Sequence, residues 1–201
     1  MRLFVAIELN DETRQAISAE QNRLQEKLGT PASGRTEGLR WVRPEHMHLT
    51  LAFLGEIATD RVQTIVEVMQ QPIDVEPFSI VFGGLATFPA HGAPRVAWLG
   101  LTSGAADVAA VHRHVTRRLE GVGIAPESRS FHPHLTLGRW RASTAADQRR
   151  ILAAGRSDKI GHVVVETVTL IHSRLSPAGP TYAPLCEARL RDPTSVPLQS
   201  D

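Results

Sequence analysis

The sequence contains one cysteine, Cys186, and no hydrophobic run as long as a membrane span. A single cysteine excludes an internal disulfide, which agrees with a reducing compartment. A membrane-spanning helix needs about 18 or more consecutive apolar residues. The apolar run within residues 1–10 is too short for a secretory signal peptide. We therefore expect a cytoplasmic protein that makes no membrane contact.

An excess of charge of one sign is also missing. The 22 Lys and Arg residues nearly balance the 21 Asp and Glu residues, and the pI is about 8.1. General nucleic-acid binders are usually far more basic. The balance favours a small or terminal phosphorylated ligand over a long duplex. The length of 201 residues and the hydrophobic share of 42% are typical of one soluble domain of two lobes.

One tetrapeptide occurs twice. Residues 48–51 and 134–137 both read His-Leu-Thr-Leu, and the copies start 86 positions apart (134 − 48). Each copy lies in an apolar segment that favours a strand, in which side chains alternate between two faces. Each would then present an imidazole and a hydroxyl on one face and two leucines to a core on the other. A single copy would be typical of a structural histidine, whereas the identical second copy favours a shared site.

Two imidazoles and two hydroxyls suit acid–base chemistry on a phosphate. A neutral imidazole accepts a proton and an imidazolium donates one near neutral pH. His48 and His134 on opposite sides of a phosphorus would activate a water and protonate a leaving oxygen. Thr50 and Thr136 would donate hydrogen bonds to the non-bridging oxygens. We expect the two imidazoles to converge across one cleft, and the residues alone leave open which is the acid and which the base.

A zinc site is the alternative interpretation of the same histidines. His46 and His132 each precede a motif histidine by two positions, so a strand would place each His-x-His pair on one face. Four imidazoles are a possible zinc ligand set. No carboxylate or cysteine recurs beside the pairs, and zinc would not explain the paired threonines. We therefore expect no metal and no cofactor, and we interpret His46 and His132 as groups at the edge of the cleft.

Two segments resemble the signatures of a known family. Residues 40–55, which read RWVRPEHMHLTLAFLG, resemble the first signature of the two-histidine (2H) phosphoesterases, and residues 131–139, FHPHLTLGR, resemble the second. Residues 1–9 and 173–182 also match, so the resemblance covers about residues 1–190. Within the family, the chain is most similar to the RNA 2′,3′-cyclic phosphodiesterases, historically called 2′-5′ RNA ligases. The two signatures in this order and at this spacing are specific.

The resemblance implies a fold and a reaction. The fold is α+β, with two pseudo-symmetric lobes whose antiparallel sheets, flanked by helices, surround a central cleft. One bilobal domain would cover residues 1–190, and residues 191–201 would form a flexible tail. The implied reaction is hydrolysis of RNA 2′,3′-cyclic phosphate ends to 2′-phosphomonoesters, with His48 as proton donor and His134 as proton acceptor, and with weak reverse 2′-5′ ligation. The implied partners are RNA 3′ ends or nucleotides bearing that cyclic phosphate, and we expect a monomer.

Hydrophobic periodicity and capping residues predict the order strand, helix, histidine strand, helix and hairpin, followed by helix, histidine strand, helix and hairpin, so the two halves share one plan. The predicted strands cover residues 2–9, 41–55, 78–88, 95–101, 131–137, 162–172 and 182–190. The predicted helices cover residues 11–28, 61–71 (capped by Asp60), 103–120 and 145–154.

Four further residues are candidates for substrate contacts, each with a structural alternative. Arg139 and Arg95 either face the phosphate or the RNA backbone or form exposed salt bridges. Phe53 either stacks on a base or packs in the core, as its shared strand parity with Leu49 favours. Tyr182 either lines the cleft or only closes the last hairpin.

Other functions are compatible with the same site. The substrate could instead be ADP-ribose 1″,2″-cyclic phosphate or a 2′-5′ oligonucleotide, a choice that we expect the loops at residues 30–38 and 89–94 to decide. An RNA-end binding module with weak or no turnover is the remaining alternative. The intact His and Thr residues of both motifs argue against it, because a binder would need arginines more than a matched acid and base.

Overall fold

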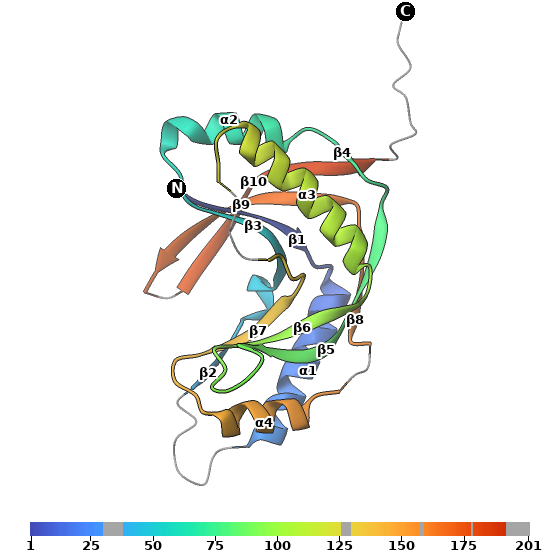
Figure 1. Cartoon of the computed structure of the whole chain (residues 1–201), viewed down its shortest axis with the longest axis vertical. Coiled ribbons are helices and arrows are strands. Elements are labelled where there is room, and N and C mark those ends of the chain that lie inside the picture. Colours follow the sequence, from blue (N-terminus) through green and yellow to red (C-terminus); the bar gives the residue numbers. More distant parts are fainter. Residues whose placement is uncertain (30–37, 126–129, 157–158, 178, 192–201) are drawn as a thin grey trace, which may run out of the picture.

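The computed structural model describes residues 1–29, 38–125, 130–156, 159–177 and 179–191, and every structural statement below refers to these residues. Within them the chain forms an α+β fold (Figure 1). The strands are β1 (Arg2–Glu8), β2 (Leu39–Trp41), β3 (His48–Glu56), β4 (Ile73–Asp74), β5 (Phe78–Phe88), β6 (Val96–Ser103), β7 (Leu135–Trp140), β8 (Gly161–Val165), β9 (Thr167–Ser176) and β10 (Gly179–Arg191). The helices are α1 (Asp11–Leu28), α2 (Thr59–Met69), α3 (Ala105–Gly121) and α4 (Ala145–Ala154), with a short 3-10 turn, η1 (Pro44–His46).

The strands make one sheet in the order β4-β10-β9-β1-β3-β7-β6-β5-β8, with β2 beside β7. All neighbouring strands are antiparallel except the short parallel pair of β4 and β10. The sheet has two halves, which meet at one residue pair between β3 and β7, Leu49 with Leu135. Helices α2 and α3 pack on the half that holds β3 and β10, and α1 and α4 pack on the half that holds β5 and β8 (Figure 1). The predicted two-lobed α+β fold is confirmed, although the lobes share one sheet.

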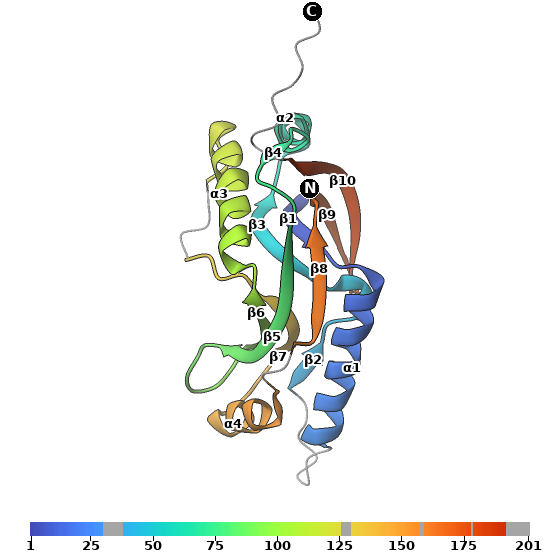
Figure 2. The ribbon, with the colours of Figure 1, turned by 90° about the vertical axis from the view of Figure 1, so that its right-hand side faces the viewer.

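The chain passes repeatedly between the two lobes. Helix α1 follows β1 of the first lobe but packs against β8 and α4 of the second, and α3 follows β6 of the second lobe but packs against β3 of the first. Figure 2 shows α3 and α1 on opposite sides of the strands. None of the described helices is both long enough and apolar enough to cross a membrane.

The strand predicted over residues 162–172 is in fact two strands in different lobes. The chain breaks at Glu166, so β8 pairs with β5 in the second lobe while β9 pairs with β1 in the first. Val163 and Val165 of β8 and Val168 of β9 are all buried. The apolar pattern therefore continues across the crossover and hides it from a local analysis.

Several predicted boundaries were wrong by a short distance. The extended segment expected before the first motif contains η1, and the second motif becomes a strand only at Leu135. Ala58 rather than Asp60 occupies the N-cap of α2, and Asp60 lies in the first turn, where a carboxylate interacts favourably with the helix dipole. Arg191, predicted to begin the tail, closes β10 and pairs with Asp74 at 2.5 Å. Residues 192–201 lie outside the described residues.

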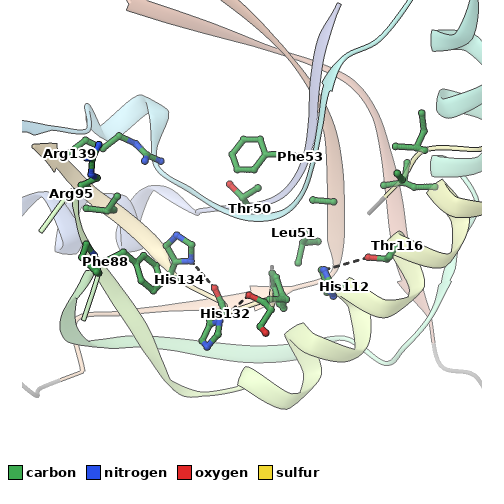
Figure 3. Close-up of a pocket in the computed structure, with 18 residues that line it drawn as sticks. Thr50, Leu51, Phe53, Phe88, Arg95, His112, Thr116, His132, His134 and Arg139 are labelled. Atoms are coloured by element: carbon green, nitrogen blue, oxygen red, sulfur yellow. Dashed lines mark hydrogen bonds between the residues drawn. The ribbon is translucent and has the colours of Figure 1, made fainter. Parts of the chain in front are cut away.

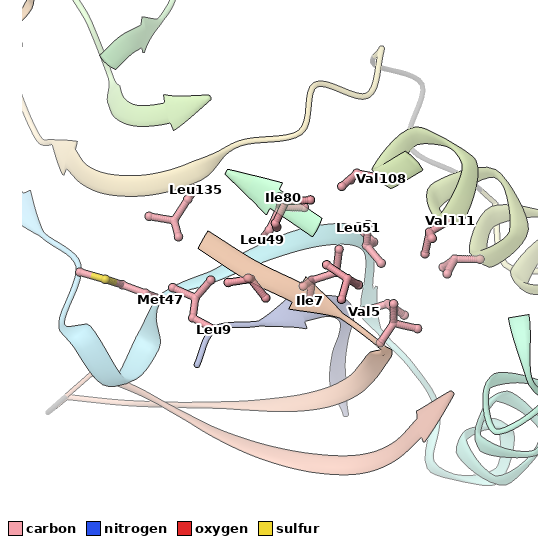
Figure 4. Packing of buried hydrophobic residues seen from close by; sticks show 14 of the residues in the cluster. Val5, Ile7, Leu9, Met47, Leu49, Leu51, Ile80, Val108, Val111 and Leu135 are labelled. Carbon is pink, nitrogen blue, oxygen red and sulfur yellow. The ribbon is translucent and has the colours of Figure 1, made fainter. Parts of the chain in front are cut away.

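The core lies on one face of the sheet and runs through both lobes. On β1, Leu3, Val5 and Ile7 are buried in this core, whereas Phe4 and Ala6 face the other side. Figure 4 shows Leu49, Leu51 and Leu135 packed with residues of β1, β5 and α3. All four motif leucines are at most 3% exposed, which confirms the predicted core face of both motifs.

Helix α1 holds the segments that carry both motifs. The Arg14 guanidinium donates to the carbonyl oxygens of Leu9, Pro44 and Met47 at 3.0, 2.6 and 3.3 Å, and so fixes the turn before β3. The Gln21 side chain is 4% exposed, and its Nε2 donates to the carbonyls of Val42 and Leu137 at 3.0 and 2.9 Å. One buried amide thus connects the segment before the first motif, at Val42, with the strand that carries the second motif, at Leu137.

Replacing this amide should destabilise the protein. We expect Gln21→Leu to lower the free energy of unfolding by about 1–3 kcal/mol, because two buried carbonyl oxygens each lose a donor. Urea denaturation followed by circular dichroism measures the change. The control is Gln15→Leu on the exposed face of the same helix. Equal stability of the two variants would show that the Gln21 hydrogen bonds contribute nothing.

Candidate active site

The pairing of β3 with β7 brings the two motifs together. Leu49 pairs with Leu135 in an antiparallel register, so His48 lies opposite Thr136 and Thr50 lies opposite His134. All four polar residues are half-buried and project from the face opposite the leucines. His48 and His134 are diagonal neighbours in this register, a relationship in which residues lie about 7–8 Å apart. The site therefore has an approximate two-fold symmetry centred on the two leucines.

Each motif histidine is oriented by the residue two positions before it. His134 Nδ1 lies 2.7 Å from the carbonyl oxygen of His132, and His48 is hydrogen-bonded to the backbone of His46. A carbonyl only accepts, so His134 Nδ1 carries the proton, and Nε2 of the neutral ring is left to accept one. His46 and His132 thus each provide a backbone hydrogen bond that orients a motif histidine, a role that any residue type could fill. Residue type therefore carries no signal for this role.

Aromatic rings surround both imidazoles. The centroid of the His48 ring lies 4.8 Å from that of Phe4 and 5.4 Å from that of Tyr182. The centroid of the His134 ring lies 5.1 Å from that of Phe88 and 5.7 Å from that of Trp98. Burial lowers the pKa of His48 to about 4, and nearby positive groups add to this effect. Burial also lowers the pKa of His134, with smaller contributions from Arg139 and His132. Both rings are therefore neutral at pH 7 in the free protein.

A bulge in β3 turns Phe53 toward the site. Ala6 pairs with Thr50 and Val5 pairs with Ala52, so Leu51 is an extra residue in β3. The strand parity changes there, and Phe53, which pairs with Phe4, faces the same side as Thr50. Phe53 is 43% exposed. Its predicted core packing is therefore wrong.

A second bulge, in β7, turns Arg139 toward the site. Trp98 pairs with Thr136 and Ala97 pairs with Gly138, so Leu137 is the extra residue. Arg139 therefore shares a face with Thr136 although the two are three positions apart. Neither Arg139 nor Arg95 takes part in an ion pair within the described residues, so the salt-bridge alternative is wrong for both.

These side chains line a cavity of about 680 Å³ (Figure 3). Six of the candidate residues border it: Thr50, Phe53, Arg95, His132, His134 and Arg139. His48 and Tyr182 instead line a neighbouring cavity of about 110 Å³ together with Glu8 and Arg14, and Thr136 borders neither of the two. The expectation that both imidazoles line one cavity is therefore corrected. The His48 ring, held by the His46 backbone, lies among Phe4 and Tyr182, whereas Thr50 and Phe53 of the same strand reach the larger cavity.

The arrangement does not support the four-histidine zinc site. The His46 ring contacts Tyr182 at 5.1 Å, while His132 Nδ1 is hydrogen-bonded to the Ser130 carbonyl at 3.0 Å. In the described part of the chain, no three or more His, Cys, Asp or Glu side chains are grouped so that they could hold a metal ion.

A family model, two relatives and one solved structure all place the chain beside the same kind of protein. The model of the 2′-5′ RNA ligase superfamily matches residues 5–176. An RNA 2′,3′-cyclic phosphodiesterase of Archaeoglobus fulgidus is 31% identical over 185 residues, which cover 92% of this chain and 98% of that protein. One from Aeropyrum pernix is 34% identical over 152 residues, which cover 75% and 86%. The crystal structure of E. coli LigT complexed with 3′-AMP is similar with a TM-score of 0.71 and 26% identity, over 94% of this chain and 97% of that one.

Because both imidazoles are buried, we predict that their pKa values are lower in the folded protein than in the unfolded chain. We expect NMR titration to give a pKa below 6.5 for both rings and near 4 for His48, compared with the same histidines in urea. The unfolded chain then binds more protons than the folded chain between about pH 4 and 6.5. His48 should therefore lower the free energy of unfolding as the pH falls through that window. A His48 pKa equal to its value in urea would contradict the burial argument.

Proposed function

The chain belongs to the 2′-5′ RNA ligase superfamily, and from this premise we propose that it hydrolyses RNA 2′,3′-cyclic phosphate ends to 2′-phosphomonoesters. The observation that carries the proposal is the pair of His-x-Thr motifs facing each other across Leu49 and Leu135. We further propose that the chain acts as a monomer in the cytoplasm. Its substrates would be RNA 3′ ends or nucleotides that bear the cyclic phosphate.

The site offers the two proton-transfer groups that ring opening needs. Water attacks phosphorus in line with the bond to O3′, so a base and an acid are required on opposite sides. We assign His134 as the acceptor of the water proton and His48 as the donor to O3′, following the family resemblance. The P–O3′ bond breaks, O3′ leaves as a hydroxyl, and the phosphate stays on O2′. Both imidazoles then return to their starting states by proton exchange with solvent.

The remaining groups bind the charge of the phosphate. Thr50 and Thr136 lie opposite the two imidazoles in the register, where their hydroxyls can donate to non-bridging oxygens. Arg139 and Arg95 are the charged residues of the larger cavity. A bound anion also favours the imidazolium form, because an opposite charge raises the pKa of a cationic group. Substrate binding would thus create the acid that the free protein lacks at pH 7.

The loops at residues 30–38 and 89–94 are the segments expected to decide among related substrates. Residues 30–37, expected to help decide between an RNA end and ADP-ribose 1″,2″-cyclic phosphate or a 2′-5′ oligonucleotide, lie outside the described residues. Phe53 and Phe88 line the larger cavity and offer rings to a base, which supports a nucleotide substrate.

The proposal predicts that each motif histidine is essential. We expect His48→Ala and His134→Ala to lower kcat on a 2′,3′-cyclic nucleotide by about 10²–10⁴-fold, because each removes one proton transfer. The matched control is His162→Ala, at an exposed position on β8 that borders neither cavity, which should keep full activity. Circular dichroism checks that the variants fold.

The same assay run with a chelator tests the metal-free mechanism. Activity should survive EDTA, since no proposed step uses a metal ion. Near-normal turnover in either histidine variant would exclude that residue as acid or base. Activity lost to EDTA and restored by zinc would contradict the mechanism.

The low pKa values of the free rings predict two different pH profiles. On the alkaline side of the pH profile, kcat should fall at a higher pH than kcat/KM. The reason is that kcat reports the enzyme–substrate complex, in which the phosphate raises the pKa of the acid. Both limbs belong to the coupled pair. Steady-state rates from pH 4 to 9 on one substrate measure the separation. Coincident upper limbs would show that the anion does not create the acid.

A further inference from the structure

The larger cavity extends well beyond the proposed phosphate site. Its second end is bordered by α3, where His112 and Thr116 lie away from Arg95 and Arg139 (Figure 3). We call the part near α3 the inner end. It is formed by Leu51, His112, Thr116, Leu119, Ile124 and Phe131.

The inner end is continuous with the motif residues because β3 has an open edge there. Strand β3 pairs with β7 only at Leu49, so the following residues of β3 have no strand beside them on that side. Thr50 and Leu51 face opposite sides of the sheet, and yet both border the cavity. The cavity therefore passes around the free edge of β3, from the hydroxyl of Thr50 to the core side of the strand.

The two ends of the cavity differ in charge. Arg95 and Arg139 are its only charged lining residues in the described chain, and both lie at the phosphate end. At the inner end the side chains of Leu51, Leu119 and Ile124 are apolar. Burial, with a smaller effect of Arg113, lowers the pKa of His112, so that ring is also uncharged at pH 7.

A flat surface and a few hydrogen-bonding groups complete the inner end. The His112 ring stacks on Phe131 with centroids 3.9 Å apart and an angle of 6° between the planes. His112 Nε2 lies 3.4 Å from Thr116 Oγ1, a long contact that leaves both groups able to bond to a ligand. An uncharged, mostly apolar pocket with a few polar groups matches an uncharged heteroaromatic ring better than a phosphate.

We propose that the inner end is a subsite for a nucleobase of the substrate, joined through its ribose to the phosphate held between Thr50 and His134. This proposal rests on the proposed function. The whole cavity, at about 680 Å³, has the size of sites that hold complete small molecules. The base comes from either the terminal nucleotide or the one before it, and both present the same chemistry.

Filling the inner end tests the proposal. We expect Thr116→Trp to raise KM at least 10-fold for 2′,3′-cyclic adenosine and uridine phosphates if the terminal base fills the inner end, or only for a dinucleotide that ends in a cyclic phosphate if the preceding base does. KM for the base-free analogue, 1-O-methylribose 2′,3′-cyclic phosphate, should stay unchanged. The matched control is Thr64→Trp on the exposed face of α2. If Thr116→Trp fails to fold, Thr116→Val serves instead and should raise KM for the nucleotides a few-fold while leaving KM for the base-free analogue unchanged.

A dinucleotide ending in a cyclic phosphate separates the two sources of the base. An effect on mononucleotides assigns the inner end to the terminal base. An effect on the dinucleotide alone assigns it to the preceding base. The proposal is overturned if neither KM responds, or if KM for the base-free analogue rises equally.

Binding separates this proposal from the proposed function. Isothermal titration calorimetry should show that wild-type protein binds a dinucleotide with a terminal 2′-phosphate at least 10-fold more tightly than inorganic phosphate, and that Thr116→Trp abolishes only this difference. That result, obtained without turnover of any cyclic phosphate, would support the subsite and refute the proposed function. Equal affinity of the wild type for both ligands would refute the subsite.

Discussion

The backbone pair between Leu49 and Leu135 is the constraint on which the rest of the site depends. It joins the two lobes into one sheet and sets the register that puts each motif imidazole opposite the threonine of the other motif. Both leucines are fully buried, so a shift of one residue would expose them and turn all four polar side chains into the core. Because the pairing extends no further, the edge of β3 beyond it is free, and the large cavity lies along that edge.

The site is symmetric in its chemistry but not in its surroundings. A bulge follows the threonine in each motif, and in each case it turns the residue three positions later toward the same face. That residue is Phe53 in the first lobe and Arg139 in the second. One lobe thus contributes a ring and the other a cation at equivalent positions. The central histidines and threonines are thus matched between the lobes, whereas the side chains around them are not.

Local patterns in the sequence predicted most of the elements and the buried leucines of both motifs, because helix periodicity, capping and the repeated tetrapeptide are all local. They could not predict the side-chain directions of Phe53 and Arg139. Those directions depend on bulges set by pairing with β1 and β6, which are distant in the sequence. The crossover at Glu166 was missed because valines are buried on both sides of it. The backbone roles of His46 and His132, and the contact of Gln21 with both motif segments, likewise leave no trace in residue type.

The repeated passage of the chain between the lobes has a consequence for how the molecule is assembled. Leu3 pairs with His172, which follows it by 169 positions (172 − 3), and helices from each half cover the other. Neither lobe is formed by one contiguous stretch of the polypeptide. During synthesis β1 can therefore pair with β3 first, and it pairs with β9 only after residues 167–176 have been made. Such distant pairings are slow to form. The pair of β3 and β7 that brings His48 and His134 together therefore lies in a sheet that neither half of the chain can form alone.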